Sequence, residues 1–335
     1  MREPRTERHA PEWQIWAALG IVYVVWGSTY LAIRIVVETM PPLLTAGTRH
    51  VSAAVIIAVL LAASGRHTSL RLSRAEWLGA GFVGLALLLG GNGLVMLGER
   101  DVPSALAALL VAVVPLWVVV LRRIFGERVA LGTALGVVAG FAGVAVLIVP
   151  QGLGGDVALG GMLMVVLAGL SWSIGSYFSK RIELPHDPLV STGAQMLVGG
   201  VGLLIVGALA GEFGLARFED FSAGSLLALL YLVVFGSVIA YTAYTWALVH
   251  ASVSRVSTYA YVNPVVAMVL GWALLNEVID LTMLVGAALI IVSVGLVIRT
   301  ESRLTPPTGA LEASAAASEA VIEPEAETPT VSRQT

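Results

Sequence analysis

Residues 252–276 read SVSRVSTYAYVNPVVAMVLGWALLN, and this stretch decides how the rest of the chain is interpreted. It is apolar enough for a membrane helix, yet Pro264 lies in its interior. Proline has no N–H, so it leaves the carbonyl oxygen four residues earlier, that of Ala260, without its helical donor. In lipid such a break is tolerated where neighbouring helices or a wet cavity satisfy the free group. The stretch therefore predicts a kinked helix beside a transport path, with a kink that serves packing alone as the alternative.

Polar side chains follow one face of the same stretch. Ser252, Arg255, Tyr259 and Asn263 are spaced by three, four and four residues, which places them on one side of a helix. We expect Tyr259 and Asn263 to face a substrate and Arg255 to lie toward the cytoplasmic mouth of its path.

The composition is that of a membrane protein. The chain is 57% hydrophobic and 12% charged, with a mean hydropathy of +0.89. It has no cysteine, which excludes a disulfide framework, a thiolate metal site and a cysteine nucleophile. It also lacks a zinc-binding His-Glu-x-x-His helix and a Gly-x-Ser-x-Gly elbow, so we expect no enzyme and no cofactor. A membrane-embedded enzyme and a channel remain as less favoured alternatives, and no basic patch suited to nucleic acid is present.

Ten apolar runs are long enough to cross a bilayer, which takes roughly 20 residues of helix. The predicted spans are 13–37, 42–64, 75–98, 103–121, 129–149, 158–179, 188–211, 222–249, 252–276 and 280–298. Residues 1–12 form a short cytoplasmic leader, and the acidic residues 301–335 have the composition of a disordered cytoplasmic tail. The fold class expected is an all-α integral membrane protein.

The distribution of basic residues predicts the orientation of the spans. With the N-terminus inside, only Arg34, Arg100 and Arg217 fall outside. The cytoplasmic side then holds Arg2, Arg5, Arg8, Arg66, Arg71, Arg74, Arg122, Arg123, Arg128, Lys180, Arg181, Arg255, Arg299, Arg303 and Arg333. This positive-inside bias places both termini in the cytoplasm.

The sequence also repeats itself. The segment from Trp26 to Arg34 matches that from Trp172 to Lys180 at an offset of 146 residues. We therefore divide the chain into two repeats, residues 13–150 and 158–299, with five helices each. Because five is odd, the second copy is upside down relative to the first, an arrangement that recurs in secondary transporters with a site near the bilayer midplane. Duplication of a membrane scaffold is the alternative.

Several motifs taken in order resemble one known family. They are Trp26-Gly-Ser-Thr-Tyr-Leu-Ala-Ile-Arg34, Arg49, Gly91-Asn92-Gly93, Pro115 with Gly126-Glu127-Arg128, Tyr259-Ala-Tyr-Val-Asn-Pro264 and Asn276-Glu277. Across residues 13–299 the chain is similar to the EamA family of the drug/metabolite transporter superfamily, and within it to the YedA-like subgroup of inner-membrane permeases. The resemblance implies ten helices in two repeats and movement of small metabolites by alternating access. Substrates in that family are diverse, so the resemblance does not choose among them.

Matching faces of the first and sixth spans are predicted to line a central cavity. Trp26, Tyr30 and Arg34 step by four residues, and so do Trp172, Ser176 and Lys180. Arg34 and Lys180 would then stand near the two mouths. The alternative is that both bases reach lipid head groups and both tryptophans belong to an interfacial belt.

The remaining positions carry weaker expectations. We expect Asn92, Tyr241 and Tyr244 to contact substrate or to serve helix packing. Arg49 lies about 10 Å inside the second span and needs a partner, which is a free carbonyl, the substrate or a structural clamp. The residues assigned structural roles are Arg49, Pro115, Pro264, Glu127 and Glu277, with capping and packing expected of the two glutamates.

Acidic residues and histidines are all expected at the ends of spans or outside them. The predicted cavity would therefore contain no buried acid. A cavity without a buried acid favours neutral, zwitterionic or anionic metabolites over purely cationic drugs. The sequence thus predicts a permease of a bacterial inner membrane, a monomer or homodimer, that exports small amino-acid-like metabolites. The alternative within this class is an exporter of drugs or toxic compounds.

Overall fold

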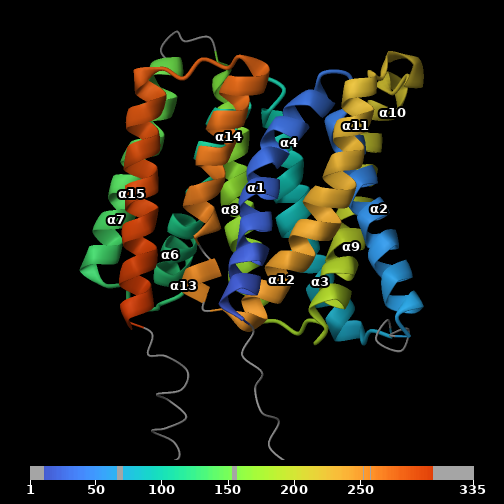
Figure 1. Cartoon of the computed structure of the whole chain (residues 1–335), viewed down its shortest axis with the longest axis horizontal. Coiled ribbons are helices and arrows are strands. Elements are labelled where there is room, and N and C mark those ends of the chain that lie inside the picture. Colours follow the sequence, from blue (N-terminus) through green and yellow to red (C-terminus); the bar gives the residue numbers. More distant parts are fainter. Residues whose placement is uncertain (1–10, 66–70, 153–156, 252, 257, 305–335) are drawn as a thin grey trace, which may run out of the picture.

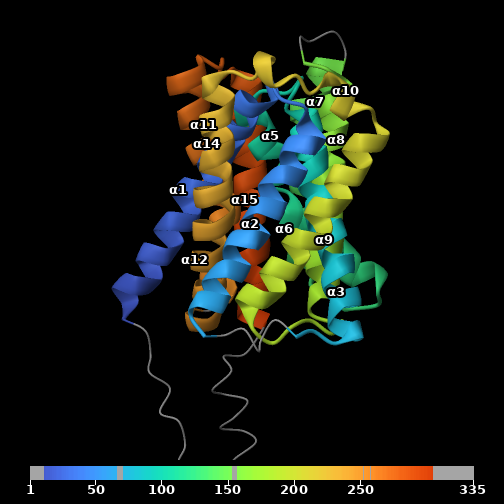
Figure 2. The same cartoon turned by 90° about the vertical axis from the view of Figure 1, so that its right-hand side faces the viewer.

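The computed structural model describes residues 11–65, 71–152, 157–251, 253–256 and 258–304, and the regular elements within them are helices. The long helices stand side by side in one bundle (Figures 1 and 2). Helix α1 begins and helix α15 ends at the lower end of the bundle in Figure 1. The elements of the first half are α1 (Glu12–Val37), α2 (Pro42–Ala63), α3 (Arg74–Gly84), η2 (Leu85–Gly93), α4 (Leu94–Gly98), α5 (Ser104–Val111), α6 (Val114–Ile124) and α7 (Leu131–Gly152).

The second half repeats this arrangement with more interruptions. Its elements are α8 (Leu159–Ser179), α9 (Pro188–Leu209), α10 (Glu212–Leu215), η3 (Phe218–Asp220), α11 (Ala223–Tyr231), η4 (Leu232–Ile239), α12 (Ala240–His250), α13 (Val253–Val256), α14 (Tyr259–Leu275) and α15 (Leu281–Leu304). Within the described residues, nine helical runs are long and apolar enough to cross a membrane. Large apolar side chains such as Leu78, Leu227 and Val292 are exposed on the outside of the bundle, as expected of a surface covered by lipid.

The predicted ninth span, 252–276, is not a single helix. It is divided into α13 and the 17-residue α14, which begins at Tyr259. The hydroxyl of Thr258 donates to the carbonyl of Arg255 at 2.6 Å, and such local side-chain bonds compete with helix propagation. Residues 252 and 257 lie outside the described part of the chain. The break therefore precedes Tyr259, and Pro264 lies further along, inside α14.

The predicted fourth span, 103–121, is also divided. A turn at residues 112–113 separates α5 from α6. Pro115 is the second residue of α6, where its missing N–H has no helical partner to lose. Pro115 thus lies at the start of a helix in the first half, whereas Pro264 lies inside a helix in the second half.

Two stretches of π-helix occur at matching places in the two halves. η2 lies in the third span and η4 in the eighth, and their first residues, Leu85 and Leu232, are 147 residues apart. π-Helical turns are rare in proteins, and those that do occur are often found at functional sites. The sequence patterns did not predict either stretch.

Helix contacts pair the two halves. α2 packs on α9, α5 on α14 and α7 on α15, while α1 packs on α14 and α8 on α5 and α6. Glycine permits the close approaches: a Cβ on Gly47 would stand 2.9 Å from the carbonyl oxygen of Gly200, and one on Gly286 3.3 Å from that of Gly143. Small residues at such crossings are typical of membrane helix pairs.

The chain ends differ from their predicted limits. α1 begins at Glu12, one residue before the predicted first span, and α15 extends to Leu304, beyond the predicted end at residue 298. Residues 301–304 are therefore helical. The rest of the predicted tail and residues 1–10 of the leader lie outside the described residues.

Candidate functional site

A cavity of about 120 Å³ lies inside the bundle between the two halves. By the measure of roughly 10–15 Å³ per water molecule, it holds several waters or part of a small solute. Its walls come from the first-half helices α1, α2, α5, α6 and the η2–α4 run, and from α8, α12 and α14 of the second half. Seven of the predicted substrate residues line it: Trp26, Tyr30, Asn92, Trp172, Tyr241, Tyr259 and Asn263.

Aromatic rings form one side of this cavity. The ring of Trp26 lies 5.2 Å from that of Tyr241 and 5.4 Å from that of Tyr259, both edge-on. Trp26 Nε1 donates to the carbonyl of Gly236 at 3.2 Å, which ties α1 to the π-helical run η4. Tyr244 packs on Trp26 from outside the cavity wall, with 5.0 Å between ring centres. It therefore supports the aromatic cluster and does not line the space.

Arg49 is the one charged residue among the described residues that line the cavity. Its side chain is buried, with the residue 4% exposed. Nε donates to the hydroxyl of Ser237 at 2.9 Å, and Nη1 makes a longer contact of 3.5 Å with Oδ1 of Asn92. These partners are neutral, and no ion pair between Arg49 and a carboxylate occurs within the described chain. A residue assigned a structural role from sequence thus presents an uncompensated positive charge to the cavity.

The two prolines face the cavity from opposite halves. Pro115 and Pro264 both line it, and so do Val111 and Ala260, the residues four positions before them. Because Pro264 lies inside α14 and cannot donate, the carbonyl of Ala260 lacks its usual helical N–H. The sequence had indicated this free carbonyl of Ala260.

Asn263 connects α14 to α1. With its amide oriented so that both contacts are satisfied, Nδ2 donates to the carbonyl oxygens of Tyr23 and Tyr259, each at 3.3 Å. Gly91 explains why Asn92 sits so close to the second half: a Cβ there would be 2.9 Å from the ring of Trp172.

The remaining predicted residues lie away from the cavity wall. Ser176 does not line it, and Lys180 is exposed at the end of α8. Arg255 pairs with Glu12, with 2.8 Å between Nη1 and Oε2, at the lower end of the bundle. Arg34 donates to the carbonyls of Glu99 and Arg100, the latter at 2.7 Å, at the upper end.

At the upper end a carboxylate of the second half caps a helix of the first. Glu277 accepts hydrogen bonds from the backbone N–H groups of Ser104 at 2.7 Å and Ala105 at 3.0 Å, the first residues of α5. Glu212 does the same for α2, accepting from Leu43 and Leu44. A carboxylate at a helix N-terminus satisfies free donors and interacts favourably with the helix dipole.

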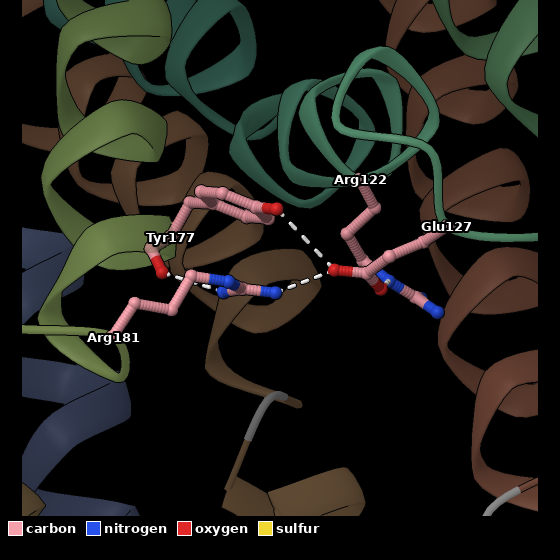
Figure 3. Close-up of polar contacts among 4 residues, drawn as sticks. All are labelled: Arg122, Glu127, Tyr177 and Arg181. Atoms are coloured by element: carbon pink, nitrogen blue, oxygen red, sulfur yellow. Dashed lines mark hydrogen bonds and ion pairs between the residues drawn. The ribbon is translucent and has the colours of Figure 1, made fainter.

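At the lower end of the bundle, Glu127 contacts three side chains, which Figure 3 shows. Its carboxylate pairs with Arg122 at 2.7 Å and with Arg181, and it accepts from the hydroxyl of Tyr177 at 3.3 Å. The guanidinium of Arg181 also lies over the Tyr177 ring, 3.6 Å from its centre. The hydrogen bond from Arg122, with the charges of Arg122 and Arg181, lowers the pKa of Glu127. This cluster joins the end of α6 to the end of α8.

One expectation about titratable groups is wrong, and a second group is more buried than its position in the sequence indicates. His50, expected at the periphery, is fully buried on α2, and neither ring nitrogen has a hydrogen-bond partner. Glu99 was expected at the end of a span, and it is there, but it is also fully buried. No sequence signal distinguishes such an acid from one in solvent, because burial here comes from helices distant in the chain. Within the described residues no cluster of three or more histidine or acidic side chains is placed to hold a metal ion.

The comparisons with known proteins agree with this architecture. The chain belongs to the EamA-like transporter family, whose model matches residues 13–149 and again residues 159–299. It is therefore a membrane transporter of the drug/metabolite transporter superfamily, with a small-molecule substrate and a bilayer as its surroundings.

Its relatives include proteins from bacteria, an archaeon and a plant. It is 37% identical over 285 residues to the uncharacterized inner membrane transporter YedA of Escherichia coli K12, covering 84% of this chain and 90% of that one. It is 27% identical over 289 residues to the chloroplastic WAT1-related protein At3g02690 of Arabidopsis thaliana, covering 84% of this chain and 69% of the plant protein. A solved crystal structure, 18% identical, matches its fold with a TM-score of 0.60 over 88% of this chain and 99% of that chain.

Proposed function

We propose that this protein is a secondary carrier that exports small amino-acid-like metabolites across the bacterial plasma membrane by alternating access. The observation that carries the proposal is the cavity between the halves, where Arg49 is the one charged group on the described wall. A buried, unpaired charge in a membrane bundle normally faces the transported solute or its pathway.

Ten transmembrane helices in two inverted five-helix repeats fit the contacts. In that arrangement the first, third and fourth spans correspond to the sixth, eighth and ninth. The π-helical runs then fall in corresponding spans, and Trp26 corresponds to Trp172 and Pro115 to Pro264. α14 supplies the ninth span and is short because α13 forms the start of that span.

The orientation we propose places the lower end of Figure 1 in the cytoplasm. Helix α13, which carries Arg255, lies at that end in Figure 1, whereas α1, which begins there, carries Arg34 in its last turn and so places it at the other end. Both termini are then cytoplasmic, in keeping with the positive-inside rule.

The cavity suits a zwitterion. A substrate carboxylate can take the free donors of Arg49, since guanidinium and carboxylate form strong charge-assisted hydrogen bonds. An ammonium group finds an acceptor in the carbonyl of Ala260 and a cation–π partner in the ring face of Trp26. A drug or toxic-compound exporter is the second candidate, because the aromatic wall also accepts flat apolar compounds. Arg49 disfavours the cationic members of that class.

Counterflow in proteoliposomes tests the proposal. An equimolar mixture of radiolabelled neutral L-amino acids should accumulate in vesicles preloaded with the unlabelled mixture. Replacing Arg49 with Gln should weaken the apparent affinity by roughly 10- to 150-fold, the equivalent of about 1.5–3 kcal/mol for a hydrogen bond to a charged group. Arg217→Gln, at an exposed site, is the matched control and should behave as the parent. Absence of saturable counterflow in the parent would reject amino-acid-like substrates.

A further inference from the structure

Glu99 is sealed from solvent one helical turn beyond Val95, which lines the cavity, and does not line the cavity itself. It follows α4 directly and is 0% exposed. Neither carboxylate oxygen has a hydrogen-bond partner. A carboxylate in such a place is costly, because a buried charge needs compensating donors. The group is therefore either neutral or poised to gain a partner when the structure changes.

The charged and titratable groups around Glu99 come from four places. α1 contributes Tyr30 and Arg34, α2 contributes Arg49, and the connection between α14 and α15 contributes Glu277. Its own loop adds Arg100 and Asp101. From α8, the contacts on the neighbouring Gly98 are with Gly161 and Val165, which carry no charge.

The neighbouring cations do not neutralise the Glu99 carboxylate in this conformation. Arg34 donates its Nη1 to the backbone carbonyls of Glu99 and Arg100 instead. Arg49 donates to Ser237 and Asn92. The nearby acid, Glu277, accepts hydrogen bonds from two backbone N–H groups at the start of α5.

A fully buried carboxyl group without hydrogen-bond donors favours its protonated form, because its charged form is neither solvated nor hydrogen-bonded. Glu277 has two N–H donors and Glu99 has none. Burial, with the Glu277 carboxylate, raises the pKa of Glu99 well above its ordinary value, and the charges of Arg34 and Arg49 only partly oppose this.

We infer that Glu99 is the proton-binding site of this carrier, protonated while the upper end is sealed and deprotonated when that end opens. In the opening step the O–H bond of the carboxyl breaks, the proton passes to entering water and the electron pair stays on the carboxylate. The guanidinium of Arg34 then leaves the carbonyls of Glu99 and Arg100 and becomes its counter-ion. Binding of an external proton reverses the step and reseals the end. This inference rests on the proposed carrier function.

Infrared spectroscopy tests the protonation state without a substrate. The protein in lipid at pH 7 should show the carbonyl-stretch band of a protonated carboxylic acid, and Glu99→Gln should remove it. Glu38→Gln is the matched control, because Glu38 lies at the same end of the bundle but is exposed. Retention of the whole band in Glu99→Gln, or its absence from the parent, would overturn the inference.

Thiol accessibility tests the link to opening. The chain has no cysteine, so Val95→Cys introduces a single reporter on the cavity wall, one turn below Glu99. The rate of alkylation by an impermeant maleimide added from outside should rise with pH more steeply in the parent background than with Glu99→Gln. The limit for one proton is about tenfold per pH unit. The Glu99→Gln background corrects for the reactivity of the thiol itself.

The outcomes separate this inference from the proposed function. Equal pH dependence in the two backgrounds, at equal membrane abundance, rejects Glu99 as the proton site even if counterflow is observed. A pH-dependent opening that requires Glu99, together with no counterflow of amino acids, supports the proton site and rejects the proposed substrate class.

Discussion

The carboxylate of Glu277, in the second half of the chain, accepts the backbone N–H of Ser104, at the start of a helix in the first half, at 2.7 Å. Glu127 holds the corresponding place between α6 and α7 but binds arginine side chains instead. The residues before the two glutamates share a left-handed backbone, with φ of 85° at Gly126 and 54° at Asn276. The two connections thus have similar turns. Their glutamates differ in their partners: Glu277 binds backbone N–H groups, and Glu127 binds arginine side chains.

Replacing Glu277 with Gln should destabilise the protein by about 1 kcal/mol, the usual worth of a helix N-cap, because the amide oxygen is a weaker acceptor at the start of α5. The expected result is a lower midpoint of thermal unfolding in detergent. Glu219→Gln, at an exposed position in η3, is the control and should leave the midpoint unchanged. Equal midpoints for both variants would contradict a stabilising role for this cap.

Stability should depend on the charge of Glu127. Its pKa is lowered in the folded protein by the hydrogen bond from Arg122 and the nearby arginine charges. A depressed carboxyl pKa stabilises the fold above the unfolded value, near 4, and the contribution disappears as pH falls through the folded value. Because the group is partly exposed, we expect no more than about 1 kcal/mol.

Thermal unfolding measured between pH 3 and pH 7 checks this, with Glu127→Gln showing a smaller loss at low pH than the parent. Glu183→Gln serves as the comparison. Glu183 is also outside the membrane spans, and within the described residues it forms no ion pair. A parent and Glu127→Gln protein that lose stability in parallel would show that the cluster does not contribute.

Replacing Asn263 with Leu should weaken the apparent affinity for substrate. Each substrate group left unpaired costs on the order of 1–3 kcal/mol, or roughly 5- to 150-fold in affinity. Val114→Leu, on the same cavity wall in the first half, removes no polar group and should have a much smaller effect.

Membrane abundance has to be measured first for both variants, because Asn263 also donates to the Tyr23 and Tyr259 carbonyls between α1 and α14. Unchanged counterflow by Asn263→Leu at parental abundance would assign Asn263 to helix packing alone.

The proposed orientation has a direct check by reporter fusions. A reporter placed after Gly155, between the two repeats, should report an external location, and one placed after Arg303 a cytoplasmic location. The basic residues at the lower end of the bundle motivate this expectation. The same location for both fusions would reject an odd number of spans per repeat.

The sequence by itself determined the class of protein. Apolar runs near the length of a bilayer, a match at an offset of 146 residues and Pro264 within an apolar run indicated a helical membrane transporter with repeats. The period of a helix also placed Trp26 and Tyr30 on one face, and both line the cavity. These features are local, so composition and spacing are enough to reveal them.

Tertiary structure decided which polar groups meet. The sequence assigned Arg49 a structural role and left Glu99 at the end of a span, because neither the cavity wall nor the burial of an acid is encoded in nearby residues. Neither Tyr244 nor Ser176 lines the cavity, and Tyr244 packs on the ring of Trp26 instead. Ser104, a partner of Glu277, lies 173 residues from it in the chain, and Arg181, one partner of Glu127, lies 54 residues from it. Such pairs form only when helices from both halves pack together, and that packing fixes the site.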